Sequence, residues 1–449
     1  MTATLSNGGG RAVVLGAGVA GLAAAAALSA AGHEVTVVER DSVVDQPVAR
    51  RGVPQSDQLH NVLGRAMQEL EALLPGFRTA LIEAGAVVSN VGLDTHIYDI
   101  GHHLPRRDLG IEIVSAWRPV IEFVARELLL AQHAPTIAAE TRAVGFELDG
   151  NGRVTGVAVR TSTDRAEVLN ADLVVDASGV NAQATRWAGR DIPTDSHTYN
   201  RWYASTPFTR VRGEGFWMIF PTAPNTRSGL VSPAGPDGWH VSVSGCENDD
   251  PPTDGAEVLA YAASLEVADI AELLDGCEAT GAPRLFRRPV AHRYRYDLLD
   301  EPIDGLVVVG DAACSLNPLL GLGLSAAAWH ASELRSLATG RTAGDLASIA
   351  GPFAAATARI SDQAWNLTTL DHHPLVAAVL ERRPGDPEPI RQAVAALIDD
   401  DPAVHRLDSA VWHLLEPAAK ITTPELVDRV LSIIAATPPP HRSPTEFRP

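Results

Sequence analysis

The chain has 449 residues, of which 45% are hydrophobic and 20% are charged. The length predicts more than one domain. The composition is typical of globular proteins and excludes a disordered or fibrous class. The net charge of -19 at pH 7 would repel nucleic acid and anionic membrane surfaces, so neither is an expected partner. Three widely spaced cysteines predict neither a disulfide framework nor a metal site.

A β-α-β unit is predicted at the start of the chain. A short β-branched run leads into the turn Gly16-Ala17-Gly18-Val19-Ala20-Gly21, an alanine-rich helix follows, and an alternating strand runs to Glu39. In a dinucleotide fingerprint Gly16 permits the tight turn, Gly18 lets the backbone approach a pyrophosphate, and Gly21 allows close helix-strand packing. Glu39 is placed to accept hydrogen bonds from a ribose diol. The uncharged stretch 12–32 could span a bilayer, but its glycine spacing favours this nucleotide-binding unit.

The following segments predict an interrupted nucleotide-binding domain with an inserted sheet. The loop "ARRGVPQSDQLHNVL" precedes a helix that stops at Pro75-Gly76, and "WRPVIEFVARELLLA" again has helical spacing. Short strands close on "ADLVVDASG", and a section rich in aromatic and turn residues has an antiparallel-sheet pattern. "DGLVVVGDAA" then restores the buried-strand pattern before another helix, and the last hundred residues have helical patterns up to a proline-rich end.

Two later motifs indicate which nucleotide is bound. "DASG" at 176–179 ends one strand, and "GDAACSLNPLLGLG" follows another, with Gly310 and Asp311 at its mouth. With the glycine turn, these motifs resemble the FAD-dependent monooxygenases of the aromatic-hydroxylase superfamily, the group A flavoproteins. The resemblance implies that FAD is the cofactor, that Asp176 belongs to its site, and that Asp311 binds the ribityl chain. It also implies a loop facing the flavin ring, formed by Pro318, Leu319, Leu320, Gly321, Leu322 and Gly323.

Further cofactor contacts follow from the same resemblance. Arg118 matches an arginine near the FAD pyrophosphate, and Arg40 directly follows Glu39. The loop "RRGVPQSDQLH" is similar to that of actinomycete members which epoxidise polyketide and polyether precursors, and it implies that Arg51 and Gln55 lie along the cofactor, with His60 close by. Val180 and Ala182 depart from the family pattern after the DG-type motif. No second glycine motif exists for a nicotinamide cofactor, so NADPH or NADH docks transiently or a partner flavin reductase supplies electrons.

The predicted fold class is α/β, with a Rossmann-like FAD-binding domain, an inserted mainly antiparallel β-sheet substrate domain and a C-terminal helical extension. The FAD-binding domain is assigned to 10–95, 118–185 and 286–350, and the substrate domain to 96–117 and 186–285. The helical C-terminal region is assigned to 351–435 and a disordered tail to 436–449. The N-terminal residues resemble no signal peptide, so a cytoplasmic protein is expected.

The resemblance implies a monooxygenase that transfers one oxygen atom from a flavin C4a-hydroperoxide to a small apolar natural-product intermediate, by epoxidation or hydroxylation, with molecular oxygen as co-substrate. The apolar loop beside the ring would keep the pocket dry. Phe216, Trp217, Phe220 and Trp239 are candidates for the substrate pocket. No catalytic residue is assigned, because none of the histidines His60, His102, His103, His240, His292 and His330 is distinguished as a base.

Other functions remain open. Baeyer–Villiger oxygenation uses the same fold. A flavin-dependent alkene reductase of the geranylgeranyl-reductase type is a further alternative, because "GFWMIFP" is faintly similar to those enzymes. Flavin halogenases rely on an active-site lysine early in the chain, whereas the single lysine here is Lys420, which disfavours halogenation. A non-enzymatic FAD-stabilised scaffold would need no aromatic sheet over the flavin.

Overall fold

A five-stranded parallel sheet forms the base of the nucleotide-binding part in the computed structural model, which describes residues 8–53, 55–235, 238–370 and 373–436. In spatial order its strands are β18 (Leu306–Val308), β12 (Leu173–Asp176), β1 (Arg11–Leu15), β2 (Glu34–Val38) and β8 (Thr136–Ala138). The strands β18, β12 and β1 are almost wholly buried and consist mostly of valine, leucine and alanine, as expected for a sheet covered on both faces. The glycine turn, the DASG motif and the GD motif follow β1, β12 and β18, so all three lie at the carboxyl edge.

Helices and a small sheet cover the parallel sheet. The helix α1 (Val19–Ala30) packs between α4 (Arg118–His133) and α8 (Gly323–Ala338), and α2 (Gly64–Leu73) also packs on α8. The other face is covered by an antiparallel sheet in the order β11-β10-β9, made of Ala166–Asn170, Val154–Thr161 and Thr141–Leu148. A second small sheet has the order β3-β7-β4, made of Leu59–Val62, Glu112–Trp117 and Val87–Asn90. The short helices are α3 (Phe77–Glu83), α5 (Gln183–Trp187) and α9 (Ala343–Leu346).

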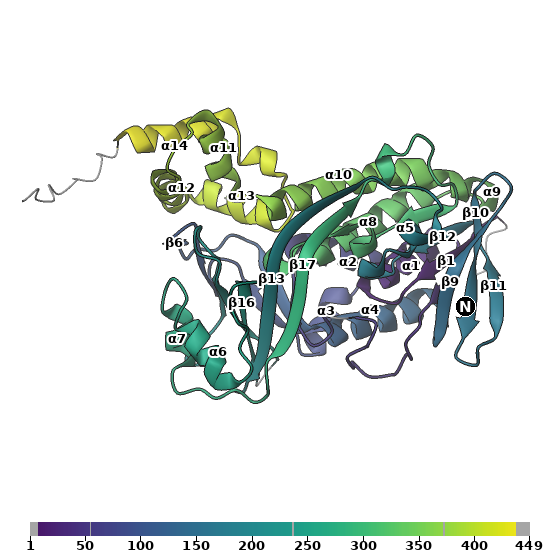
Figure 1. Ribbon diagram of the computed structural model, residues 1–449, viewed down its shortest axis with the longest axis horizontal. Coiled ribbons are helices and arrows are strands. Elements are labelled where there is room, and N and C mark those ends of the chain that lie inside the picture. The colour runs from purple at the N-terminus through teal and green to yellow at the C-terminus, as the bar shows by residue number, and fades with distance from the viewer. Residues whose placement is uncertain (1–7, 54, 236–237, 371–372, 437–449) are drawn as a thin grey trace, which may run out of the picture.

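An eight-stranded sheet stands beside the carboxyl edge, and its two long strands β13 and β17 curve through the centre of Figure 1. All of its pairings are antiparallel except that between β14 and β5. Its strands are, in spatial order, β19 (Cys314–Ser315), β17 (Arg284–Tyr294), β13 (Thr194–Phe208), β16 (Trp239–Cys246), β15 (Ser228–Pro233), β14 (Phe216–Ile219), β5 (Thr95–Asp99) and β6 (His102–His103). The helices α6 (Gly255–Ala262) and α7 (Asp269–Leu274) pack on its outer face.

The C-terminal helices gather at one end of the molecule, drawn in yellow-green to yellow in Figure 1. The long helix α10 (Ala350–Thr369) packs on α8 and leads to α11 (Pro374–Arg382), α12 (Glu388–Asp400), α13 (Pro402–Trp412) and α14 (Pro424–Ala436). These last four helices share an aliphatic core of their own. The predicted α/β class, antiparallel insert and helical C-terminal extension are therefore confirmed.

The strands expected in the range 96–117 divide between two sheets, since β5 and β6 join the large sheet while β7 joins the small one. Of the tail expected at 436–449, only Ala436 falls within the described residues. In the described part of the chain, no helix has both the length and the apolar character that a membrane crossing requires.

Candidate active site

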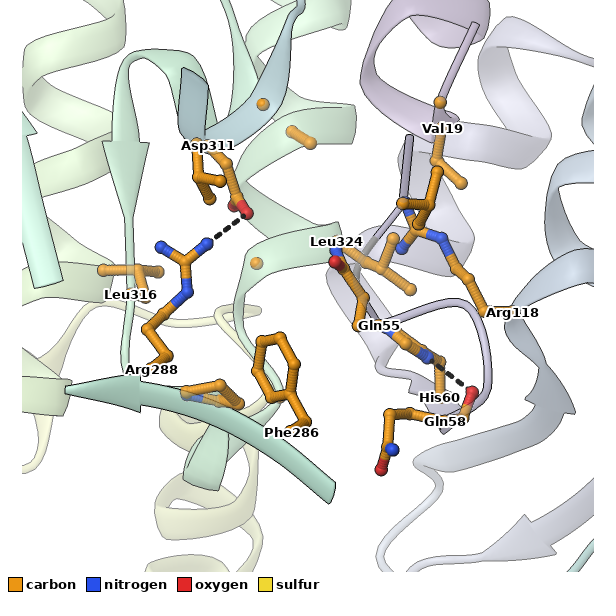
Figure 2. A pocket seen from close by; sticks show the side chains of 18 of the residues that line it. Val19, Gln55, Gln58, His60, Arg118, Phe286, Arg288, Asp311, Leu316 and Leu324 are labelled. Atoms are coloured by element: carbon orange, nitrogen blue, oxygen red, sulfur yellow. Dashed lines mark hydrogen bonds and ion pairs between the residues drawn. The ribbon is translucent and has the colours of Figure 1, made fainter. Parts of the chain in front are cut away.

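A cavity of about 370 Å³ lies between the carboxyl edge of the parallel sheet and the inner face of the large sheet. Residues from all three sequence motifs line it: Gly16, Gly18, Ser178, Gly179 and Asp311. In Figure 2, Arg288, Asp311 and Phe286 lie on one side of this cavity, and Gln55, Arg118 and His60 lie on the other. Motifs that are far apart in the sequence therefore meet at one site.

The glycine turn leaves the start of α1 open toward this cavity. A Cβ atom on Gly21 would lie 1.9 Å from the carbonyl oxygen of Gly16, so this residue must stay glycine for the turn to close. A Cβ atom on Gly18 would instead meet no atom closer than Glu122 Oε1, at 3.8 Å. The backbone at Gly18 is thus accessible to a phosphate, beside N–H groups at the helix N-terminus.

Two arginines and two glutamates form a buried charge network beside this turn. Arg50 pairs with Glu39 at 2.7 Å and with Glu122 at 2.6 Å, and Arg118 Nε donates to Glu122 at 2.8 Å. Glu39 also accepts a hydrogen bond from the backbone N–H of Ala17, at 2.8 Å. Burial lowers the pKa of Arg50, but the charges of Glu122 and Glu39 more than offset burial, and the net pKa is raised. The four side chains hold one another beside the glycine turn.

Arg50 was not among the predicted site residues, whereas its neighbour Arg51 was. The structure places Arg50 in the cavity lining and Arg51 on the exposed surface, outside that lining. Two adjacent arginines in an irregular loop have no periodicity that distinguishes the inward side chain from the outward one. The predicted residues Arg40, Gln55 and Arg118 do line the cavity.

Asp176 and Gly310 support the site from behind the lining. The carboxylate of Asp176 is fully buried and accepts hydrogen bonds from the backbone N–H groups of Ser178, at 2.9 Å, and Ala184, at 2.6 Å. Gly310 has φ +59°, and a Cβ atom there would lie 2.8 Å from the Cβ atom of Ala20. Its N–H donates to His330 Nδ1 at 3.2 Å. Both residues thus shape the loops that line the cavity.

Asp311 faces the cavity and pairs with an arginine of the large sheet. Its Oδ2 atom lies 3.5 Å from Nη2 of Arg288, as Figure 2 shows. Arg288 and Phe286 are two residues apart on β17, so the period of the strand directs both side chains to the lining. Sequence reasoning missed Arg288, although this alternation could have indicated it.

The inner face of the large sheet forms the opposite wall, and strand alternation decides which aromatic residues reach it. Phe216 and Phe220 line the cavity, whereas Trp217 stacks on His96 at a ring distance of 3.6 Å and packs against the core behind the sheet. Trp239 packs in the same core. The four aromatic residues predicted as one group therefore lie on two faces, because successive side chains of a strand point in opposite directions.

Hydroxyl groups also lie on this inner wall. Alternate residues of three neighbouring strands place serines in the lining, namely Ser205, Ser228, Ser242 and Ser244. The sheet wall of the cavity therefore carries hydroxyl groups as well as apolar side chains. The loop side of the cavity is more apolar, since Leu316, Leu319 and Leu320 line it together with Pro318, Gly321 and Gly323. Leu322 is fully buried and does not line the cavity.

Two histidines, His60 and His240, line the cavity as neutral side chains. Burial lowers the pKa of each to about 3, and the charge of Arg118 further disfavours protonation of His60. They can exchange hydrogen bonds with a ligand but carry no positive charge at neutral pH. His102, His103, His292 and His330 lie outside the lining. No histidine base is therefore assigned.

These buried neutral histidines predict a sensitivity to acid. Burial lowers the pKa of His60, His240 and His413 to about 3, whereas an unfolded histidine titrates near ~6.5. Between these values the unfolded chain binds more protons, so the stability contribution is complete above about pH 6.5 and is lost as the pH falls toward about 3. We expect the urea midpoint to decrease between pH ~7 and pH ~5, and less steeply in His240→Phe. An unchanged midpoint across this range would contradict the expectation.

The C-terminal helices hold the proline-glycine loop, residues 318–323. Trp412, at the end of α13, donates from Nε1 to the carbonyl oxygen of Leu320 at 3.1 Å, and its ring meets that of Phe220 edge to face. Asn317 Oδ1 accepts from Tyr203 at 2.7 Å and from the N–H of Leu319 at 3.2 Å. This role of the C-terminal region had no signal in the sequence.

Replacing Trp412 by phenylalanine removes the donor to Leu320 while keeping an aromatic ring against Phe220. We expect FAD to dissociate about 5- to 10-fold faster, because a typical hydrogen bond contributes about 1 kcal/mol. Flavin fluorescence after dilution measures this rate. Trp217→Phe, which removes an indole donor to the carbonyl oxygen of Glu214 outside the lining, is the matched control. An equal rate in both variants would contradict this role of Trp412.

The residues present fit FAD. The open backbone at Gly18 suits a pyrophosphate, Glu39 suits a ribose, and Asp311 lies between this end and the proline-glycine loop. Arg40, Arg50 and Arg118 line the same cavity and can balance phosphate charge. These residues would hold the group along the whole length of the cavity.

Sequence comparisons agree with this assignment. A family model described as FAD dependent oxidoreductase matches residues 12–197. Protein Rv3254 of Mycobacterium tuberculosis is 30% identical over 395 residues, which are 82% of this chain and 81% of that protein. Digeranylgeranylglycerophospholipid reductase 1 of Methanopyrus kandleri is 28% identical over 358 residues, 75% of this chain and 79% of that protein.

Solved structures have the same fold at low sequence identity. A flavoprotein/dehydrogenase from Cytophaga hutchinsonii has a TM-score of 0.65 at 18% identity, covering 94% of this chain and 98% of that chain. A triple mutant of the flavin-dependent brominase Bmp2 has a TM-score of 0.63 at 14% identity, covering 95% and 98%. The 2-methyl-3-hydroxypyridine-5-carboxylic acid oxygenase has a TM-score of 0.55 at 17% identity, covering 95% and 96%.

The predicted enzyme class and cofactor are thereby confirmed at the level of the family. The chain belongs to the FAD-dependent oxidoreductases, enzymes that use FAD, and it has the fold shared by flavoprotein oxygenases and flavin-dependent halogenases.

Proposed function

We propose that the protein is an FAD-dependent monooxygenase that inserts one oxygen atom into a small, largely apolar molecule, by epoxidation or hydroxylation of a natural-product intermediate. The observation that carries this proposal is the joining of the three cofactor motifs and the inner sheet wall in one cavity. A substrate against Phe216, Met218 and Phe220 would face the flavin loop directly. Bound FAD would supply the oxygen-transfer chemistry.

The chain's own residues would position the reactants and exclude water. Glu39 and Asp311 would accept hydrogen bonds from the two sugar-like parts of the cofactor, and the leucines of the loop would keep water from the ring. The serines of the sheet wall and the neutral His60 and His240 would orient polar atoms of the substrate. No side chain is assigned as a proton-transfer base, which suits oxygen transfer to an alkene better than to a phenol. NADPH, NADH or a separate reductase would supply electrons.

A second candidate is reduction of an alkene, which the similarity to the Methanopyrus kandleri reductase favours. Halogenation is not proposed, despite the fold shared with a brominase. Lys420, the single lysine, lies in the segment between α13 and α14 and pairs with Glu416. Its side chain is 57% exposed and lies outside the cavity lining.

One experiment with two arms distinguishes oxygen transfer from alkene reduction. FAD-loaded protein is photoreduced without oxygen and mixed with geranylgeraniol as an alkene probe, either under isotopically labelled oxygen or anaerobically. A product with one labelled oxygen atom, formed only in the first arm, supports the monooxygenase. The monooxygenase proposal would be overturned in favour of the reductase by a saturated product in the anaerobic arm, if the arm under labelled oxygen yields labelled hydrogen peroxide as its sole oxygen product.

A further inference from the structure

A second cavity of about 330 Å³ lies behind the flavin loop, between the large sheet and the C-terminal helices. It shares one wall with the flavin cavity, formed by Phe220, Asn317, Leu319, Leu320 and Trp412. Its remaining lining comes from the end of the large sheet and from α10 to α13, none of which carries a sequence motif. An occupant of this cavity would touch the flavin loop on the side away from the flavin.

Three polar atoms in the lining of this second cavity have no hydrogen-bond partner among the described residues. They are Thr222 Oγ1, Arg391 Nη1 and His405 Nδ1. The three residues are only 8%, 9% and 2% exposed. A buried polar group without a partner is unfavourable and is found rarely in native proteins. Three such atoms around one cavity indicate a ligand that supplies the missing hydrogen bonds.

Two buried arginines, Arg201 and Arg391, line this second cavity. Arg201 is 7% exposed, and its Nη1 donates to the carbonyl oxygen of Thr226 at 2.7 Å and to Ser244 Oγ at 3.0 Å. It forms no ion pair with any carboxylate of the described chain. Arg391 pairs with Glu388 through Nε and Nη2, which leaves Nη1 for the cavity. Arg201 is thus a buried cation without a counter-ion among the described residues, an arrangement that costs free energy.

The lining also contains two acidic side chains, Asp99 and Asp408. Asp408 is already paired with His373, at 2.6 Å. Burial raises the pKa of Asp99, which disfavours its charged form. Much of the remaining lining is aliphatic, with Ile97, Leu104, Leu367, Val376 and Val411. The cavity thus combines an apolar body with a cationic, donor-rich part.

We propose that the second cavity binds an organic anion, a molecule with an aliphatic body and one carboxylate end, held by Arg391 and Arg201. Thr222 and His405 complete the hydrogen bonds of the carboxylate. The aliphatic body lies against Leu319 and Leu320. The bound anion therefore stabilises the flavin loop by contacting the side that faces away from the flavin cavity. This inference does not depend on whether the flavin site oxygenates or reduces its substrate.

Calorimetric titration of the FAD-loaded protein tests the proposal with decanoate and 1-decanol, which share one aliphatic chain. We expect decanoate to bind at least about 10-fold more tightly, because a hydrogen bond to a charged group is stronger than one to a neutral hydroxyl. Equal affinity for both probes, or no binding of decanoate, would overturn the proposal.

Four variants locate the binding site. Arg391→Met and Arg201→Met are expected to weaken decanoate binding by about 10- to 100-fold. Arg406→Met removes an exposed arginine of α13 outside the cavity lining and is expected to change nothing. Arg288→Met instead removes one of the cations that line the flavin cavity. Loss of decanoate binding in Arg288→Met with retention in Arg391→Met would place the anion at the flavin and overturn the proposal.

Thermal unfolding and FAD content show whether each variant keeps its fold. If Arg201→Met does not fold, His405→Phe removes the unpartnered Nδ1 atom while keeping a planar ring in the same place. Weaker decanoate binding in both His405→Phe and Arg391→Met, with unchanged binding of 1-decanol, supports the site. Unchanged decanoate binding in both refutes it.

Discussion

Replacement of Arg50 by methionine is expected to lower the affinity for FAD by at least about 100-fold and to reduce stability. Arg50 is the shared partner of Glu39 and Glu122, and both glutamates are at least nine-tenths buried. Removing one partner of a buried ion pair costs about 3–5 kcal/mol, because the remaining charge is left uncompensated. Fluorescence titration of apoprotein with FAD measures the affinity, and urea unfolding measures the stability.

The adjacent residue provides the control for this prediction. Arg51→Met removes the same charge from an exposed position outside the cavity lining, so FAD affinity should remain within about 2-fold of the original. If the two variants lost equal affinity, the general positive charge of the loop would be responsible. The buried network would then have no special role.

Replacement of Asp311 by alanine is expected to weaken FAD binding by about 10- to 100-fold, since hydrogen bonds to a charged group contribute about 1.5–3 kcal/mol. The change also leaves Arg288 without the carboxylate that lies 3.5 Å away. Asp311→Asn keeps the size and one acceptor, so it should retain more FAD than the alanine variant.

The measurement is the flavin-to-protein absorbance ratio after gel filtration. Asp300→Ala, at an exposed residue beyond β17 and outside the lining, controls for the loss of one negative charge. Full flavin content in Asp311→Ala would contradict the assigned role of Asp311.

The meeting of the three motifs at one edge of the parallel sheet could be predicted from the sequence because its determinants are local. The tight turn and close backbone approach require glycine at Gly16, Gly18 and Gly21. Glu39 and Asp311 occur where buried strands end. Parallel strands bring these ends to one edge whatever the rest of the chain does. The α/β class and the antiparallel insert likewise follow from patterns of period two and 3.6.

The sheet wall of the cavity could be predicted only in part, because it depends on which face of each strand turns inward. Phe216 and Phe220 share a face that Trp217 does not, and the serines of β13, β15 and β16 share it too. Arg50 points inward through tertiary packing that no local pattern encodes, whereas the alternation along β17 could have indicated Arg288. The contact of Trp412 with Leu320 joins segments whose proximity only the folded chain establishes.

That contact has a consequence for the order in which the protein matures. A chain leaving the ribosome completes the glycine turn, the DASG motif and the GD motif before it makes α13. The carbonyl oxygen of Leu320 therefore lacks this hydrogen-bond donor until Trp412 is synthesised. We therefore expect a chain that ends before α13 to contain every flavin motif and yet to release FAD faster than the full chain.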